Sequence, residues 1–76
     1  MTETTIYETD DRAARRRVAT FRRPEETLAV FATGRQAPDD DTLRVYRVVD
    51  LGSDSDGEWE TAAALAQPGE TLIGLH

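Results

Sequence analysis

Hydrophobic and polar positions alternate most clearly in the second half of the chain. Apolar side chains recur at every second position from Leu43 to Leu51, with one interruption at Arg47. A period of two residues predicts a β-strand with one buried face. Residues 58–61 also alternate, residues 72–75 favour a last strand, and turn sequences at 53–57 and 67–70 separate these segments. The second half therefore predicts a three-stranded antiparallel meander.

Residues 12–23 show the spacing of a helix. Ala14, Val18 and Phe21 recur at i, i+4 and i+7, Asp10 or Asp11 can cap the first turn, and Pro24 stops the helix. The opposite arc of this predicted helix carries five arginines, with Arg17 apart: Arg12, Arg15, Arg16, Arg22 and Arg23. A rival interpretation pairs residues 18–21 with residues 27–33 as a β-hairpin. We favour the helix because alanine and arginine are good helix formers.

Two further segments have weaker patterns. Residues 4–8 form a short β-prone run. Residues 27–33 fit either a helix opened by Pro24-Glu25-Glu26 or a buried strand rich in Thr, Val and Phe. Gly34 ends either element, and residues 34–41 are expected to form a loop. His76 is expected to be a frayed end.

These elements predict one α+β domain over residues 1–76. An antiparallel β-meander of about four strands would pack against one basic amphipathic helix. The alternative is a small all-β barrel or sandwich. The chain has 76 residues, so its core is thin, and self-association would help to stabilise it.

The most unusual feature of the composition is its charge. The chain has fifteen acidic and nine basic residues, which gives a net charge of -6. All nine basic residues are arginine, and both Lys and Asn are absent. Residues 1–38 carry a net +1 and residues 39–76 a net -7. At molar salt the Debye length shrinks to about 3 Å, so repulsion between surface carboxylates is largely screened. A thin core beneath an acidic surface therefore suits a very salty cytoplasm.

This overall balance resembles that of small, uncharacterised proteins of extremely halophilic archaea. The resemblance lies in composition along the whole chain and names no family. It implies a halophilic, archaeal protein. A GC-rich genome alone would also favour arginine over lysine, but it would not account for the excess of acids.

The residues needed for most catalytic and ligand chemistry are missing. The chain has no cysteine, no lysine and no glycine-rich phosphate loop, and its single histidine stands alone. The acidic run at 50–58 fails the EF-hand test, because Gly52 and Ala63 would occupy positions that need carboxylates. We therefore expect no enzyme, no cofactor and no metal site. The absence of a long apolar run or a signal-like start predicts a cytoplasmic protein without membrane contact.

The arginine face and Trp59 are the candidate binding residues. Arginine binds phosphate bidentately, but affinity falls with roughly the -0.9Z power of salt, so five contacts would lose on the order of five to six decades in brine. We therefore expect a small non-enzymatic binding or regulatory protein that acts through protein–protein contact, including contact with a second copy of itself. A nucleic-acid-binding regulator and an accessory subunit of an enzyme are the alternatives. Trp59 is expected in the core, with an exposed interface anchor as the alternative.

Overall fold

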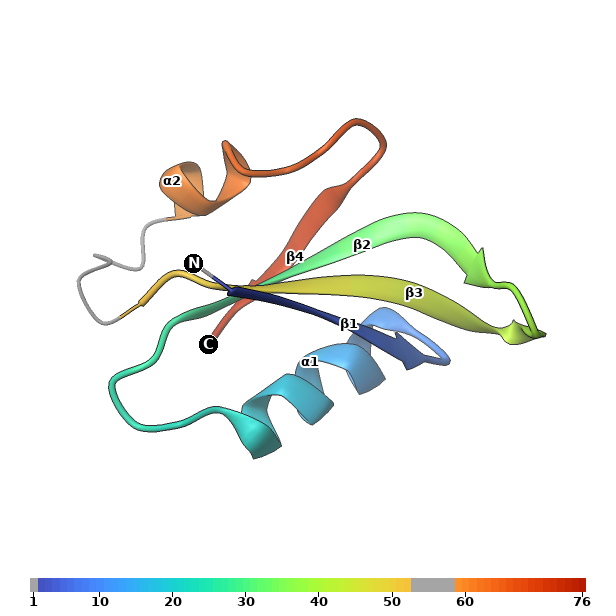
Figure 1. Ribbon diagram of the computed structural model, residues 1–76, viewed down its shortest axis with the longest axis horizontal. Helices are drawn as coiled ribbons and strands as arrows, with labels where there is room; N and C mark the ends of the chain where they lie inside the picture. The colour runs from blue at the N-terminus through green and yellow to red at the C-terminus, as the bar shows by residue number, and fades with distance from the viewer. Residues whose placement is uncertain (1, 53–58) are drawn as a thin grey trace.

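The computed structural model describes residues 2–52 and 59–76. The elements in this part of the chain are β1 (Thr2–Glu8), α1 (Asp11–Phe21), β2 (Leu28–Ala37), β3 (Asp40–Asp50), α2 (Trp59–Ala63) and β4 (Thr71–Leu75). The strands form one antiparallel sheet in the order β1-β3-β2-β4, and α1 and α2 lie on opposite sides of it (Figure 1). The predicted α+β class is confirmed. The all-β alternative is wrong, because the sheet is open and carries helices.

The helix predicted in the first half is confirmed, and with it the hairpin interpretation of residues 18–21 is excluded. The Asp10 carboxylate caps α1 by accepting a hydrogen bond of 2.8 Å from the Ala13 N–H. Ala14 and Val18 are fully buried against the sheet. The helix ends at Phe21, earlier than predicted, so Arg22 and Arg23 lie beyond it.

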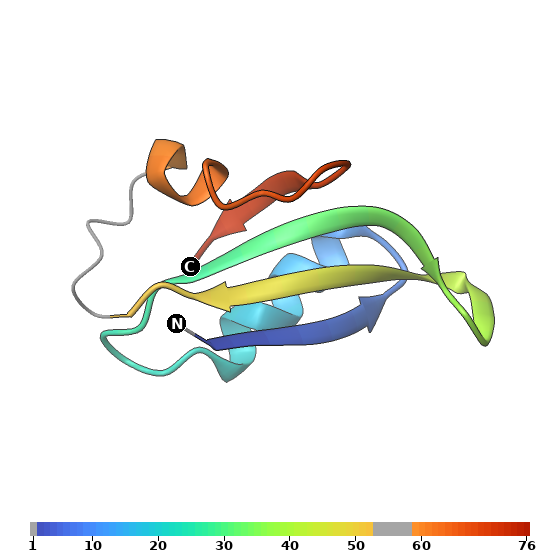
Figure 2. The same cartoon turned by 45° about the horizontal axis from the view of Figure 1, so that its top comes forward.

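The ambiguous segment at residues 27–33 is a strand. Residues 28–31 of β2 are all buried, because this central strand is covered on both faces and therefore shows no alternation. The loop expected at residues 34–41 is wrong except for the turn at residues 38–39, because residues 34–37 belong to β2 and residues 40–41 to β3. Gly34, with φ of 77°, lies in a β-bulge, and the strand continues to Ala37. The resulting β2–β3 hairpin projects beyond the other strands (Figure 2).

The meander predicted in the second half does not form. Residues 59–63 are the helix α2, and β4 pairs with β2 instead of following β3 in the sheet. The alternation at 58–61 covers only four residues, and the alanine-rich sequence that follows has strong helix propensity. The turn expected at 53–57 and the strand position Glu58 lie outside the described residues.

Two apolar clusters fill the space on the two faces of the sheet. The α1 side contains Ile6, Ala14, Val18, Leu28, Val30, Tyr46 and Val48. The α2 side contains Ala29, Phe31, Val49, Ala62 and Leu72. Successive residues of β2 therefore contribute to opposite clusters, as the two-residue period of a strand requires. The central β2–β3 hairpin therefore contributes buried residues to both clusters.

Candidate functional site

The five arginines predicted to share one helix face are distributed over different environments. Arg12 and Arg16 are exposed on α1. Arg15 is half-buried, and its Cδ lies 3.1 Å from where a Cβ on Gly74 of β4 would stand. The arginine stem thus packs over a glycine of the last strand.

Arg22 and Arg23 belong to the connection between α1 and β2. The Arg22 Nε–H donates a hydrogen bond of 2.8 Å to the Glu26 carbonyl, and the Arg23 backbone N–H donates one of 3.1 Å to the Glu26 carboxylate. Arg17, set apart in the sequence pattern, pairs with Glu8 at 3.0 Å. The predicted continuous arginine face is therefore broken up by the end of the helix at Phe21.

Trp59 is on the first turn of α2 and has 51% of its surface exposed. The expectation that it belongs to the core is wrong, because its segment is a helix whose buried residue is Ala62. Two other large apolar residues, Tyr7 at 43% and Phe21 at 44%, are also exposed. Ile6 packs on the α1 side, so its neighbour Tyr7 points to the α2 side of the sheet. Exposed aromatic residues of this kind favour protein contacts.

Arg47 is the one interruption in the alternation of β3, and its largely buried side chain joins this strand to residues 65–70. Its guanidinium lies 4.7 Å from the centre of the Phe31 ring and donates hydrogen bonds to the Leu65 carbonyl at 2.9 Å and to Glu70 at 2.7 Å. The side chains of Arg47 and Glu70 are only 11% and 4% exposed. A longer contact of 3.3 Å reaches Glu3 on β1.

Arg47 and Glu70 each stabilise the charged form of the other. The hydrogen bond between the two side chains raises the pKa of Arg47 and lowers the pKa of Glu70. The Glu70 carboxylate also accepts a hydrogen bond of 2.9 Å from the Gln67 N–H. Both groups are fully engaged in joining β3 to the segment before β4, so their role is structural. The broken alternation was the sequence signal for Arg47, but it could not identify Glu70.

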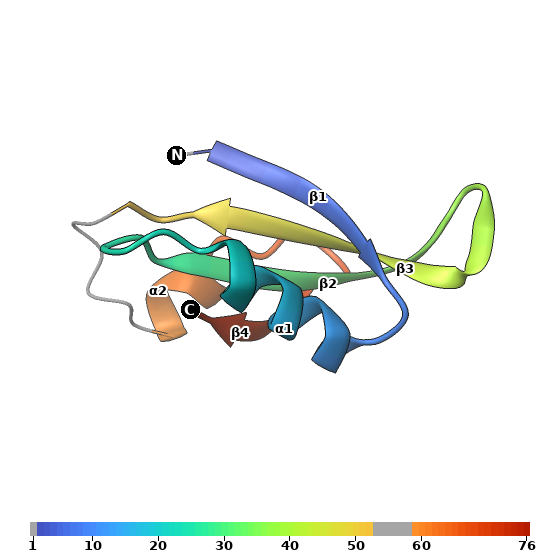
Figure 3. The same ribbon diagram turned by 90° about the horizontal axis from the view of Figure 1, so that it is seen from below.

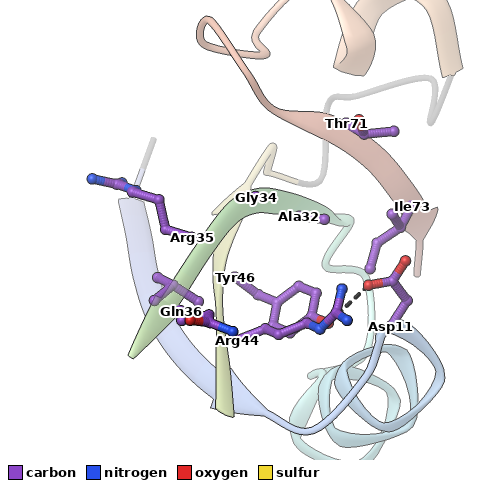
Figure 4. A pocket seen from close by; sticks show the side chains of 10 residues that line it. Asp11, Ala32, Gly34, Arg35, Gln36, Arg44, Tyr46, Thr71 and Ile73 are labelled. Atoms are coloured by element: carbon purple, nitrogen blue, oxygen red, sulfur yellow. Dashed lines mark hydrogen bonds between the residues drawn. The ribbon is translucent and has the colours of Figure 1, made fainter. Parts of the chain in front are cut away.

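A concavity of about 490 Å³ lies between the start of α1, the bulge of β2 and β4 (Figure 4). The buried Tyr46 hydroxyl donates a hydrogen bond of 2.8 Å to the Asp11 carboxylate there. Burial, and then this bond, raises the pKa of the Tyr46 phenol well above its ordinary value. The phenol therefore stays protonated as a hydrogen-bond donor and holds α1 on the sheet. Arg44 and Thr71 also line the concavity, whose walls thus carry both signs of charge.

Asp40 and Asp50, at the two ends of β3, each accept a hydrogen bond from the residue two positions further along the chain. Asp40 accepts hydrogen bonds from the Thr42 hydroxyl and N–H, and these lower the pKa of its carboxyl. Asp50 accepts one of 2.7 Å from the Gly52 N–H. Within the described ranges, no cluster of three or more His, Asp or Glu side chains is placed to hold a metal ion. Asp54, Asp56 and Glu58 of the acidic run lie outside those ranges.

His76 is held in the sheet, so the expected frayed end is wrong. Its backbone exchanges hydrogen bonds of 2.7 and 2.9 Å with Leu28. Burial, and then the positive charges of Arg15 and Arg22, lower the pKa of its imidazole. Packing of His76 next to the end of β4 therefore disfavours the charged form of its imidazole.

The two edge strands of the sheet differ in how they present their backbone. β1 pairs with β3 in unbroken register over seven residues, and no described element lies along its outer side (Figure 3). β4 has five residues, and its pairing with β2 is interrupted by a register shift. Bulges and short length protect an edge from pairing with other chains. β1 has neither protection, and sequence patterns could not show that it would be an edge.

Comparison of the chain with protein-family models, curated proteins and solved structures found no match. Neither helix in the described residues is long and apolar enough to cross a membrane.

Proposed function

We propose that this chain is a small, non-enzymatic binding or regulatory protein that acts through protein–protein contact, with the β1 edge as its docking element. The observation that carries the proposal is the seven-residue strand with unbroken register and an uncovered outer side. Such an edge pairs with an extended segment of another polypeptide through backbone hydrogen bonds. Tyr7, exposed on this strand, adds an aromatic contact.

The placement of the arginines favours a protein partner over a nucleic acid. Phosphate binding gains affinity with the number of guanidinium groups that are available to contact phosphates. Here the Arg15 stem packs on β4, and the Arg22 guanidinium donates a hydrogen bond to the Glu26 carbonyl, so two of the five arginines are already engaged. An accessory subunit of an enzyme would use the same protein contact.

A charge placed in the middle of β1 is expected to weaken partner binding at least tenfold. Thr5 is exposed on β1, and a lysine there opposes strand addition, as charged residues do on natural sheet edges. Thr61→Lys makes the same change at an exposed position on α2 and is the matched control. Proteins retained from a lysate of the producing cells in multi-molar KCl would be identified by mass spectrometry. Each would then be purified, and its binding to the three chains measured by calorimetry.

The expected result is a purified partner that binds the wild type and Thr61→Lys equally and binds Thr5→Lys at least tenfold more weakly. Equal binding to all three chains would exclude the β1 edge as the docking element. If no purified protein binds and the chain also fails to associate with itself, the proposal of a protein-contact function fails.

We also propose that the protein operates in concentrated salt, and we expect its melting temperature to rise with KCl. Seven of the described carboxylate residues are exposed: Glu3, Asp10, Glu25, Asp39, Asp40, Asp41 and Glu60. Between about 0.1 M and 1 M salt the Debye length falls from about 10 Å to 3 Å, which screens their repulsion. A gain of about 1 kcal/mol corresponds to roughly 4–8 °C for a domain of this size.

Circular dichroism melting in KCl, with a series in sucrose alongside, tests this expectation. Sucrose strengthens burial without screening charge, so it separates the two effects of salt. An unchanged melting temperature across the KCl series would contradict the proposal of salt adaptation.

A further inference from the structure

We infer that the β1 edge binds the β1 edge of a second copy of this chain, in an antiparallel pair with its two-fold axis at Thr5. This inference rests on the proposed use of β1 in protein contact and specifies the partner. The two four-stranded sheets would then form one continuous sheet. A two-fold interface uses the same surface on both copies, so it must be complementary to itself.

The geometry of a strand restricts where that axis can lie. Residues directly opposite each other in an antiparallel pair point to the same face, and faces alternate along the strand. A symmetric pair must therefore be centred on a residue. Thr5 is the middle of Thr2–Glu8, so centring there pairs all seven residues, whereas centring on Thr4 or Ile6 pairs only five.

The charges on β1 are compatible with this register. Its two acidic residues, Glu3 and Glu8, fall opposite Tyr7 and Thr2 of the second copy, so no carboxylate faces another. The Glu3 carboxylate is already paired with Arg47 at 3.3 Å. The Tyr7 hydroxyl is a hydrogen-bond donor and a carboxylate is an acceptor, so this cross-strand pair is complementary. At the axis, Thr5 meets Thr5, a favourable cross-strand combination.

The other edge is less suited to the same contact. β4 offers five residues, and between its pairs with Val30 and Phe31 the register shifts. Ile73 is the extra residue there, because Gly74 pairs with Val30 and Leu72 with Phe31. A bulge increases local twist and disturbs the backbone ladder that a second copy would need. The edge with an unbroken register is β1.

Cross-linking through a single cysteine tests the position of the axis. The chain has no cysteine, so Thr5→Cys introduces one thiol per copy. Directly opposite Cβ atoms lie about 4.5–5.5 Å apart, within reach of a short bis-maleimide. We expect Thr5→Cys to be converted largely to covalent dimer, while Thr61→Cys on α2 and Thr71→Cys on β4 remain monomeric. Dimer yield at Thr5→Cys no higher than at Thr61→Cys would overturn the inference, as would preferential cross-linking at Thr71→Cys.

A charge exchange at the same residue supplies a second readout. Thr5→Arg and Thr5→Glu each place like charges directly opposite at the axis, which is unfavourable. In sedimentation equilibrium at moderate salt, we expect each variant to dimerise about tenfold more weakly than the wild type, and an equimolar mixture to recover the association. Melting curves of both variants check that they are folded. Equal dimerisation of the separate and mixed variants would contradict a Thr5 axis.

The outcomes separate this inference from the proposed function. A wild-type chain that sediments as a monomer but binds a purified partner through Thr5 would overturn the homodimer and leave the protein-contact function standing. A monomer that binds no partner would overturn both. A dimer that cross-links at Thr5→Cys and recovers on mixing would support both.

Discussion

Arg47→Met is expected to lower the free energy of unfolding by about 3–5 kcal/mol, because it leaves the Glu70 carboxylate buried without its cation. The Glu70 side chain is only 4% exposed in the intact pair, so without Arg47 its charge would be poorly hydrated. The substitution also removes the cation over the Phe31 ring and the hydrogen bond to the Leu65 carbonyl. Small domains have total stabilities of about 5–15 kcal/mol, so this loss is a large fraction of the whole.

Urea denaturation followed by circular dichroism measures the loss, and a double-mutant cycle assigns it to the pair. Glu70→Leu removes the buried carboxylate, so Arg47→Met/Glu70→Leu is expected to be more stable than Arg47→Met alone. Arg44→Met, at an exposed position on the same strand, is the control and is expected to change stability by about 0.5 kcal/mol or less. If Arg47→Met and Arg44→Met had equal effects, the structural role of Arg47 would be refuted.

The same pair implies a dependence of stability on pH. The hydrogen bond from Arg47 holds the pKa of Glu70 below its ordinary range, so the folded state binds this proton less readily than the unfolded state. A lowered pKa adds stability that is fully present above the unfolded value of about 4.3 and is lost as pH falls through the folded value. Stability should therefore decline below about pH 4.3 in the wild type, and Glu70→Gln should lack this part of the decline.

Phe31→Ala is expected to destabilise the chain by about 3–5 kcal/mol. Phe31 is fully buried in the cluster on the α2 side, where it packs with Val49 and Leu72. Truncation removes the apolar contacts of the ring and leaves a cavity beneath the Arg47 guanidinium. In a domain of this size, 3 kcal/mol corresponds to a fall in melting temperature of more than about 10 °C.

The chain provides a matched control for this substitution. Phe21→Ala makes the same change at the end of α1, where the ring is 44% exposed. Its expected effect is at most about 1 kcal/mol, because nearly half of the residue's surface already contacts water and its removal leaves no enclosed cavity. Calorimetric melting of both variants checks the contrast. Comparable losses from Phe21→Ala and Phe31→Ala would show that the core does not lie where the structure places it.

Local patterns were sufficient to predict the helix α1 and the presence of a strand at β3. The i, i+4 spacing of Ala14 and Val18 and the cap at Asp10 predicted α1, because helix geometry and capping depend on neighbouring residues. The alternation from residue 43 to residue 51 predicted the strand β3, but it did not predict that both faces are buried, with Tyr46 and Val48 on the α1 side and Val49 on the α2 side.

Patterns failed where the environment comes from distant segments. β2 is covered on both faces, so residues 28–31 gave no period to distinguish strand from helix. Residues 59–61 alternate, yet α2 forms there because the alanine-rich continuation supplies Ala62 to the core. The partner of Arg47 lies 23 residues away, a separation that no local spacing predicts.

The features of the candidate site also separate into those that the sequence determined and those that only the tertiary structure decided. The sequence by itself determined the charge balance, the exclusion of thiol chemistry, the strand tendency of residues 4–8 and the α1 helix, since these follow from composition and short-range geometry. Only the tertiary structure decided that β3 lies between β1 and β2, which leaves β1 as an unbulged edge and exposes Tyr7. Strand order depends on which faces are buried together across the whole chain, and that is a property of packing.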